Sequence, residues 1–198
     1  MTVSQSDLLN ALPFTLGEDA SARPEKARDF LALWHAADSN TRLSQDDEGN
    51  SVLHFIALYG YDDLIQTVLN DEPELAEKKR TYTDEYPIHL AVSNAIFEEH
   101  GDSGLAVIKK LYACDPNTAT HQNSDDQTAL HYAVRYGSAK MVKYCCEHLG
   151  QANIDEKDTE GMTALAWAES KPAMKAYLIG QGAKEAEVDF RAQTQMRL

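Results

Sequence analysis

The chain has 198 residues, which is enough for one domain or for a short array of repeats. It carries 18 Lys and Arg residues against 32 Asp and Glu residues, a formal net charge of −14 at pH 7. Such a charge repels phosphate backbones and anionic lipid surfaces, so we expect neither nucleic acid nor a membrane as a partner. A protein partner with a basic patch fits better, although acidic residues that only maintain solubility would give the same composition.

The cysteines and the first residues bear on the compartment. Cys114, Cys145 and Cys146 are odd in number and show no disulfide framework or C-x-x-C spacing, so we expect reduced thiols that mostly fill the core. Residues 1–20 lack the basic start and apolar run of a secretory signal, and no stretch approaches 18 apolar residues. Together these features predict a cytoplasmic protein.

An amphipathic helix is predicted over residues 24–37, because apolar side chains recur there at spacings of three and four residues: Ala27, Phe30, Leu31, Trp34 and Ala37. We expect this helix and residues 6–12 to belong to a degenerate unit over residues 1–45. Such a unit would cap the N-terminal end of the repeats that follow, since an uncapped end leaves an apolar face in water.

A four-residue phrase recurs four times along the rest of the chain. Residues 51–54, 86–89, 128–131 and 163–166 have the sequences Ser-Val-Leu-His, Tyr-Pro-Ile-His, Thr-Ala-Leu-His and Thr-Ala-Leu-Ala. Their last positions, 54, 89, 131 and 166, are successively 35, 42 and 35 residues apart. A unit of this length cannot bury its own apolar face, so the periodicity predicts modules that stack on one another.

Each module combines a polar turn with two helices. In the first, residues 46–49 have turn chemistry, Ser51 offers a hydroxyl at a helix start, and Gly60 is placed to end that helix. A second helix follows with Leu64, Ile65, Val68 and Leu69 on its apolar face. We predict modules near residues 46–80, 81–122, 123–157 and 158–184, followed by a polar tail over residues 185–198.

The second module departs from this pattern. Tyr86 replaces the capping hydroxyl, although Pro87 suits a first helical turn. A polar insertion rich in breakers lies around residues 96–104, between the two predicted helices. Insertions in stacked repeats map to one face, which is often the binding face. Asp84 and Asp126 also stand where the first and fourth modules have the turn glycines Gly49 and Gly161.

These phrases resemble the Thr-Pro-Leu-His motif of ankyrin repeats, and the helix stops Gly60 and Gly137 match the same family. The resemblance covers about residues 24–184 and implies an all-α ankyrin solenoid of about four repeats with an N-terminal cap. In such stacks, partner contacts come from the loop tips and from the exposed side of each first helix. Carried over to this chain, those positions are Asp47, Glu48, Asn50, Leu58, Tyr59, Tyr82, Glu85, Asn94, Asp125, Gln127, Arg135, Tyr136, Glu160 and Met162.

Catalytic and metal sites are not predicted. Equivalent positions of adjacent repeats lie roughly 8–10 Å apart, whereas zinc needs nitrogen ligands at about 2.0–2.1 Å, so His54, His89 and His131 cannot share an ion. We expect these histidines to hydrogen-bond the turns of neighbouring repeats, as the family resemblance also implies. The chain has no phosphate-binding loop, G-x-S-x-G or H-E-x-x-H motif, and we expect no enzyme activity and no cofactor.

We therefore predict a monomeric, non-enzymatic protein-binding module. Tyr59 and Tyr136 occupy equivalent positions, and exposed Tyr and Arg are favoured as binding anchors. Acidic residues recur at the tips, although Asp is common in turns for local reasons. A regulator or scaffold, an inhibitor or antidote of a toxic enzyme, and a bacterial effector that acts on host proteins remain alternatives.

Overall fold

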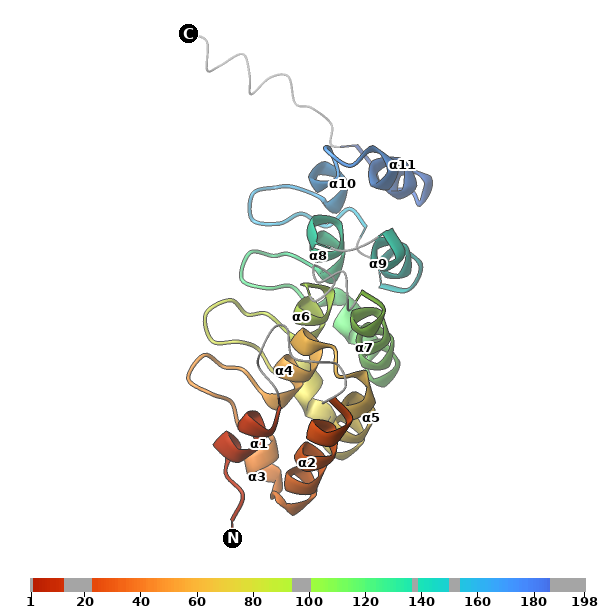
Figure 1. Ribbon diagram of the computed structural model, residues 1–198. Helices are drawn as coiled ribbons and strands as arrows, with labels where there is room; N and C mark the ends of the chain where they lie inside the picture. The colour runs from red at the N-terminus through yellow and green to blue at the C-terminus, as the bar shows by residue number, and fades with distance from the viewer. Residues whose placement is uncertain (1, 13–22, 94–100, 137–138, 150–153, 186–198) are drawn as a thin grey trace.

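The computed structural model describes residues 2–12, 23–93, 101–136, 139–149 and 154–185. Within these ranges the regular structure is helical, apart from one isolated antiparallel bridge between Lys157 and Thr163, which confirms the predicted all-α class. None of the helices in these ranges is both long and apolar enough to cross a lipid bilayer. The α-helices labelled in Figure 1 are α1 (Gln5–Ala11), α2 (Arg23–Ala36), α3 (Ser39–Arg42), α4 (Val52–Tyr59), α5 (Asp62–Asp71), α6 (Pro87–Ser93), α7 (Gly101–Cys114), α8 (Ala129–Tyr136), α9 (Ala139–Tyr144), α10 (Ala164–Trp167) and α11 (Pro172–Gly180).

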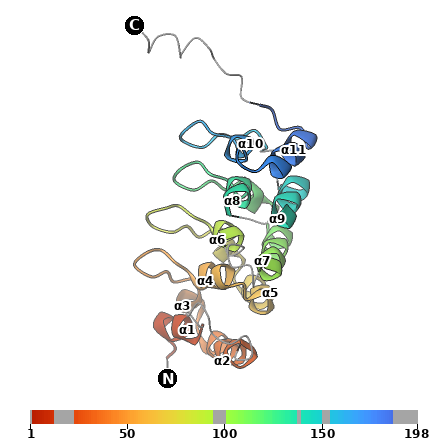
Figure 2. The same cartoon turned by 45° about the horizontal axis from the view of Figure 1, so that its top comes forward.

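The helices form two adjacent columns, as Figures 1 and 2 show. The inner helices α4, α6, α8 and α10 stack in one column, and the outer helices α5, α7, α9 and α11 stack in the other. Along the inner column, α4 contacts α6, α6 contacts α8, and α8 contacts α10. Short 3₁₀ helices over Pro73–Glu77 and Pro116–Thr120 follow α5 and α7. This is the stacked solenoid that the periodicity predicts.

Local signals set the bounds of these helices as expected. Ser51 is the N-cap of α4, and Thr163 is the N-cap of α10, where its hydroxyl accepts a hydrogen bond from the Ala166 N–H. Gly60 ends α4 in the left-handed conformation with φ of 69°, which a residue without Cβ adopts at no steric cost. Pro87 is the first residue of α6, where a helix needs no N–H donor.

The core lies between the two columns. Fully burying one aliphatic side chain stabilises a protein by about 1.5–3 kcal/mol, so neighbouring layers stabilise these short helices far more than helix propensity does. In the first helix pair, the buried residues are Val52, Leu53, His54, Ile56 and Ala57 of α4 and Leu64, Ile65, Val68 and Leu69 of α5.

The N-terminal helices lie against this first pair. α1 contacts α2 and α4, and α2 contacts α5. Phe30 and Trp34 of α2 are completely buried, with ring centroids 5.8 Å apart. The Trp34 indole N–H also donates to Asp71 Oδ2 at 2.8 Å, which ties α2 to the end of α5. The helix predicted over residues 24–37 is thus confirmed, and α1 to α3 occupy the N-terminal end of the stack (Figure 1).

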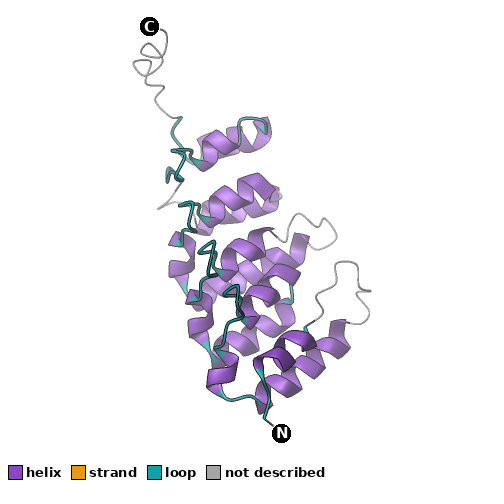
Figure 3. Cartoon of the chain, turned by 90° about the vertical axis from the view of Figure 1, so that its left-hand side faces the viewer, coloured by secondary structure: helices purple, strands orange, loops and turns teal. Residues whose placement is uncertain are grey.

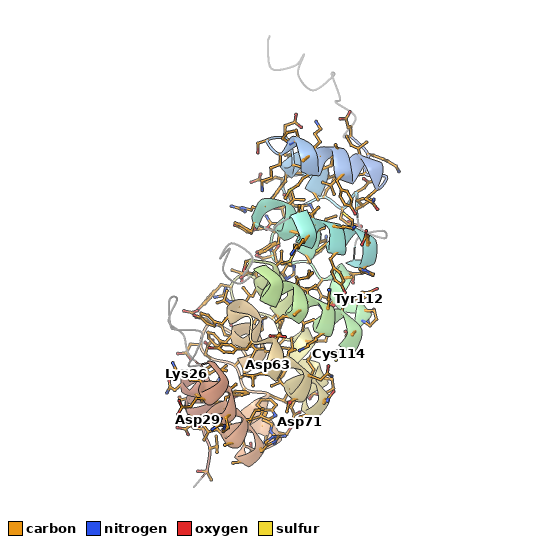
Figure 4. The ribbon with its side chains drawn as sticks, turned by 45° about the vertical axis from the view of Figure 1, so that its right-hand side comes forward. Lys26, Asp29, Asp63, Asp71, Tyr112 and Cys114 are labelled. Carbon is orange, nitrogen blue, oxygen red and sulfur yellow. The ribbon has the colours of Figure 1, made fainter. Side chains whose placement is uncertain are left out.

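The prediction for the cysteines is confirmed, whereas the predicted extent of the insertion before α7 needs correction. The three thiols are free and mostly fill the core: Cys145 and Cys146 are buried, and Cys114, at the end of α7, is exposed (Figure 4). Residues 101–104, expected in the insertion, form the first turn of α7, since packing against α5 and α6 outweighs the low helix propensity of glycine. Residues 94–100, Gly137 and the chain from residue 186 lie outside the described residues.

Candidate protein-binding site

A hairpin-like loop precedes each inner helix, and these loops, which we call tips, project on the same side of the molecule (Figure 3). They comprise residues 46–50, 80–85, 123–127 and 158–162, so the second tip is one residue longer than the others. Tyr82 lies in this longer tip and is 78% exposed. In each tip the N–H of the first residue donates to the carbonyl of the last: Asp46 to Asn50 (3.0 Å), Arg80 to Glu85 (3.0 Å), Asn123 to Gln127 (3.1 Å) and Asp158 to Met162 (3.0 Å).

The next-to-last residue of every tip has a left-handed backbone. Its φ is 80° at Gly49, 49° at Asp84, 56° at Asp126 and 77° at Gly161. The aspartates that replace glycine therefore keep the turn, at the steric cost that an L-residue has in this region. A Cβ at Gly49 would lie 2.4 Å from the backbone N of Thr81, so glycine is also required there by the approach of the second tip.

Neighbouring tips are joined directly through their backbones. The link from each tip to the next is one hydrogen bond of 2.9 Å, in which an N–H of the later tip donates to a carbonyl of the earlier one: Thr81 to Glu48, Ser124 to Thr83, and Thr159 to Asp125. The tips thus form a continuous ribbon rather than separate loops, and these bonds tie the backbone of each tip to that of the next.

A ladder of histidines fixes each inner helix to the following tip. The Nε2 atoms of His54, His89 and His131 lie 3.1 Å from the carbonyl oxygens of Glu85, Gln127 and Met162, respectively. Each Nδ1 accepts a backbone N–H at the start of its own helix, so the proton is on Nε2 and is donated to the next tip. Burial lowers the pKa of His54 and of His89 to about 4. The predicted structural role of the three histidines is confirmed.

The first charged cluster, the Glu85 network, joins the first two tips to α8. Arg80 Nη1 donates to Glu85 Oε2 at 2.8 Å, and Arg80 Nη2 lies 3.4 Å from Glu48 Oε2. Glu85 also accepts hydrogen bonds from the hydroxyls of Tyr132 (2.6 Å) and Thr83 (2.9 Å). Burial raises the pKa of Glu85, but these bonds outweigh it and hold the pKa below its ordinary value. The charges of this network are largely compensated within the protein.

A second charged cluster lies between the third and fourth tips. Here the tips, the end of α8 and the segment after α10 enclose an open groove of about 560 Å³. We call it the Arg135 groove. Its lining residues are Asp125, Gln127, Arg135, Thr159, Glu160, Trp167, Ser170 and Lys171.

Arg135 occupies a fixed place in this groove. Its guanidinium carbon lies 4.9 Å from the ring centroid of Tyr136 and 5.1 Å from that of Trp167. The Trp167 indole N–H donates to Oδ2 of the buried Asp158 at 3.0 Å, which holds the ring in place. Two aromatic faces thus position the cation without neutralising it.

Lys171 supplies the second cation of the groove. Its ammonium donates to the main-chain carbonyls of Val134 and Arg135, the latter at 2.9 Å, at the end of α8. Cations are favoured there, because the last carbonyls of a helix carry partial negative charge. Among the described residues, neither Arg135 nor Lys171 forms an ion pair with a carboxylate.

Parts of the chain are similar in sequence to known proteins. The family model for ankyrin repeats, in three copies, matches residues 95–189. Together with the stacked helix pairs, this match identifies the fold as an all-α ankyrin solenoid. The chain is 26% identical over 123 residues to an ankyrin repeat protein of Acanthamoeba polyphaga mimivirus. The aligned segment covers 62% of the chain and 15% of that protein. The chain is also 42% identical over 64 residues to the E3 ubiquitin-protein ligase KEG of Arabidopsis thaliana. This aligned segment covers 31% of the chain and 4% of the ligase.

The chain therefore matches only small parts of these two relatives. Ankyrin repeats are in general protein-interaction modules, and the family is in general non-enzymatic. In the described part of this ankyrin-repeat chain, no group of three His, Cys, Asp or Glu side chains could hold a metal ion. Burial raises the pKa of the Cys146 thiol to about 11, and the pKa of Cys145 is raised as well, so these thiols are poor nucleophiles.

The structure separates the partner-binding residues carried over from the family resemblance into three groups. Asn50 and Gln127 are buried and hydrogen-bond within their own tips, and Asn94 lies outside the described residues. Four are half-buried: Leu58, Tyr59, Glu85 and Tyr136. The exposed ones are Asp47, Glu48, Tyr82, Asp125, Arg135, Glu160 and Met162. Asp125, Gln127, Arg135 and Glu160 come together in the Arg135 groove.

Sequence reasoning missed Trp167 and Lys171. Trp167 directly follows the fourth position of the histidine ladder, just as Tyr132 follows His131, and this recurrence of an aromatic residue was the available signal. Lys171 precedes the Pro172 that begins α11, and nothing in its local sequence indicates that it reaches the end of α8, 36 residues earlier.

Proposed function

We propose that this ankyrin-repeat protein is a non-enzymatic binding module that holds a protein partner against its tips and inner helices, with the Arg135 groove at the centre. The observation that carries the proposal is the groove itself. It contains exposed charges and an aromatic ring on rigid supports, and those charges have no ion-pair partner among the described residues. Such preorganised groups lose little conformational freedom on binding.

The net charge supports a protein as the partner. A field of −14 charges attracts proteins that carry a basic patch and accelerates their association, while it repels nucleic acids. The exposed acids of the tips, which include Asp47, Asp125 and Glu160, extend this field over the side on which the groove opens.

Site-specific photocrosslinking tests the proposal and identifies the partner in the same experiment. A photoreactive phenylalanine analogue replaces Thr159 at the groove, and in a matched control it replaces Gln66, an exposed residue of the outer helix α5. We expect the Thr159 variant to yield a discrete protein adduct in cell lysate, identified by mass spectrometry, and the Gln66 variant not to yield it.

Equal yields of the same adduct from both positions would contradict the proposal, because they would indicate non-specific contact. An adduct obtained only from Gln66 would move the binding surface to the outer helices. Circular dichroism of both variants verifies that the helical fold is retained.

A further inference from the structure

We infer that the Arg135 groove recognises a peptide segment that carries both an acidic and a basic side chain, rather than a uniformly basic one. This inference rests on the proposed function and specifies the partner's chemistry at that site. It differs from what the overall charge alone predicts, because the groove contains cations that the net charge conceals.

The first step concerns the two cations. Arg135 and Lys171 line the same groove, and in the described part of the chain no carboxylate of the protein neutralises them. The planar guanidinium of Arg135 can donate two parallel hydrogen bonds to one carboxylate. An Asp or Glu side chain of the partner, or its C-terminal carboxylate, supplies the acceptor that fits both cations.

The second step concerns the two acids. Asp125 belongs to the third tip and Glu160 to the fourth. Both line the same groove as Arg135 and carry the opposite charge. Their backbones are fixed: the Asp125 N–H donates to Asn123 Oδ1 and the Glu160 N–H donates to Asp158 Oδ1, both at 3.0 Å. Both side chains are exposed and form no ion pair among the described residues, so they can accept a Lys or Arg of the partner.

The third step is discrimination. A uniformly basic segment would place a cation beside Arg135 and Lys171, and a uniformly acidic segment would place an anion beside Asp125 and Glu160. Either arrangement brings like charges together in a groove that the segment partly desolvates, which is unfavourable. Only a segment with both signs of charge compensates all four groups.

Peptide selection tests the inference directly. A random library of 12-residue peptides displayed on phage is selected on the immobilised 198-residue chain. We expect the enriched peptides to contain an acidic and a basic residue within a few positions of each other. Fluorescence anisotropy then gives the affinity of the best peptide and of two derivatives. In one derivative the acidic residue is replaced by its amide (Asn for Asp, Gln for Glu), and in the other the basic residue is replaced by Gln.

Protein variants assign each charge to its partner. Arg135→Gln and Glu160→Gln are each compared with a matched control of the same exposed residue type outside the groove, Arg28→Gln and Glu74→Gln. Neutralising the acidic residue of the peptide should weaken binding to the wild-type chain about tenfold, but should have little effect on binding to Arg135→Gln. Neutralising the basic residue of the peptide should likewise weaken binding to the wild-type chain but have little effect on binding to Glu160→Gln. The two control variants should bind all three peptides as the wild type does.

The outcomes separate this inference from the proposed function. Groove-dependent peptides that contain only basic residues would overturn the inference and leave the proposed function intact. The inference would also be overturned if neutralising the acidic residue of the peptide reduced the affinity for the wild type and for Arg135→Gln by the same factor. Peptides that bind the wild type and the groove variants equally, or a selection without any enrichment, would contradict both.

Discussion

The Glu85 network and the Arg135 groove lie along the same ribbon of tips, yet their charges are used differently. In the Glu85 network, Arg80 and Glu85 form an ion pair of 2.8 Å, and Tyr132 and Thr83 complete the hydrogen bonding of the carboxylate. In the Arg135 groove, aromatic rings and main-chain carbonyls hold the cations, and the nearby acids stay uncompensated within the described residues.

The difference separates stabilising charges from charges that are available for binding. Tyr132 belongs to α8, so the Glu85 network ties the second tip to the third inner helix and consolidates the stack. The Arg135 groove contributes less to that purpose, because its cations compensate no acid of the protein among the described residues. A repeat protein can thus use one part of its tip ribbon for stability and another for recognition.

The largest expected effect is on the stability of the Glu85 network. Glu85→Ala removes the closer of the two carboxylates that Arg80 contacts and the acceptor of the buried Tyr132 hydroxyl, so we expect the free energy of unfolding to fall by about 3 kcal/mol. Glu160→Ala, at the exposed tip of the groove, should change it by less than about 0.5 kcal/mol. Urea denaturation of both variants measures the difference, and equal losses would contradict the distinction between the two regions.

Acidification should lower the free energy of unfolding of the whole stack, because the histidine ladder runs through both the Glu85 network and the Arg135 groove. Burial keeps His54 and His89 neutral in the folded state, with a pKa of about 4, whereas the unfolded chain protonates them near pH 6.5. The unfolded state therefore binds more protons below pH 6.5, and stability falls as pH falls. We expect a loss of about 1–2 kcal/mol between pH 6.5 and pH 5.5, measured by urea denaturation.

Glu77 provides an internal control for this pH dependence. Burial and a hydrogen bond with Asp115 raise the pKa of Glu77 to about 7, so the folded state binds a proton there that the unfolded state releases. Glu77 thus opposes the histidines by at most about one proton. Glu77→Gln should make the dependence of stability on pH steeper, and a shallower dependence would contradict this assignment.

The smallest expected effect is local to the third tip. Asp126 has a φ of 56°, so Asp126→Gly should relieve strain and raise the free energy of unfolding by about 0.5 kcal/mol. The neighbouring Asp125 is not left-handed, and Asp125→Gly should instead lower stability, since glycine gains flexibility in the unfolded chain. Thermal unfolding compares the stabilities of the two variants. Changes of the same sign in both variants would show that the effect at Asp126 does not come from backbone strain.

Much of the fold could be predicted from short-range signals. The phrases ending at His54, His89 and His131 are local, and each histidine bonds the start of its own helix and one carbonyl of the next tip. The periodicity of these phrases therefore gives both the helices and their stacking. Buried polar residues of the tips were harder to recognise, since Asn50 and Gln127 are as polar as their exposed neighbours.

The candidate site depends on contacts that the sequence does not encode locally. The contact between Arg135 and Trp167 joins residues in successive repeats, and the bonds from Lys171 to the end of α8 do the same. Which charges remain uncompensated follows from such distances across the stack. The extra residue of the second tip could not be recognised from the spacing either. The step from His54 to His89 is 35 residues, as is the step from His131 to Ala166, because the segment before the second tip is one residue shorter.

The most direct test of the binding site is hydrogen–deuterium exchange of the chain with and without the partner captured at Thr159. We predict slower exchange on binding at residues 123–127 and 158–162 and in α10, with α2 and α5 unchanged. Protection confined to the outer helices, or no change at the third and fourth tips, would contradict the assignment of recognition to the Arg135 groove.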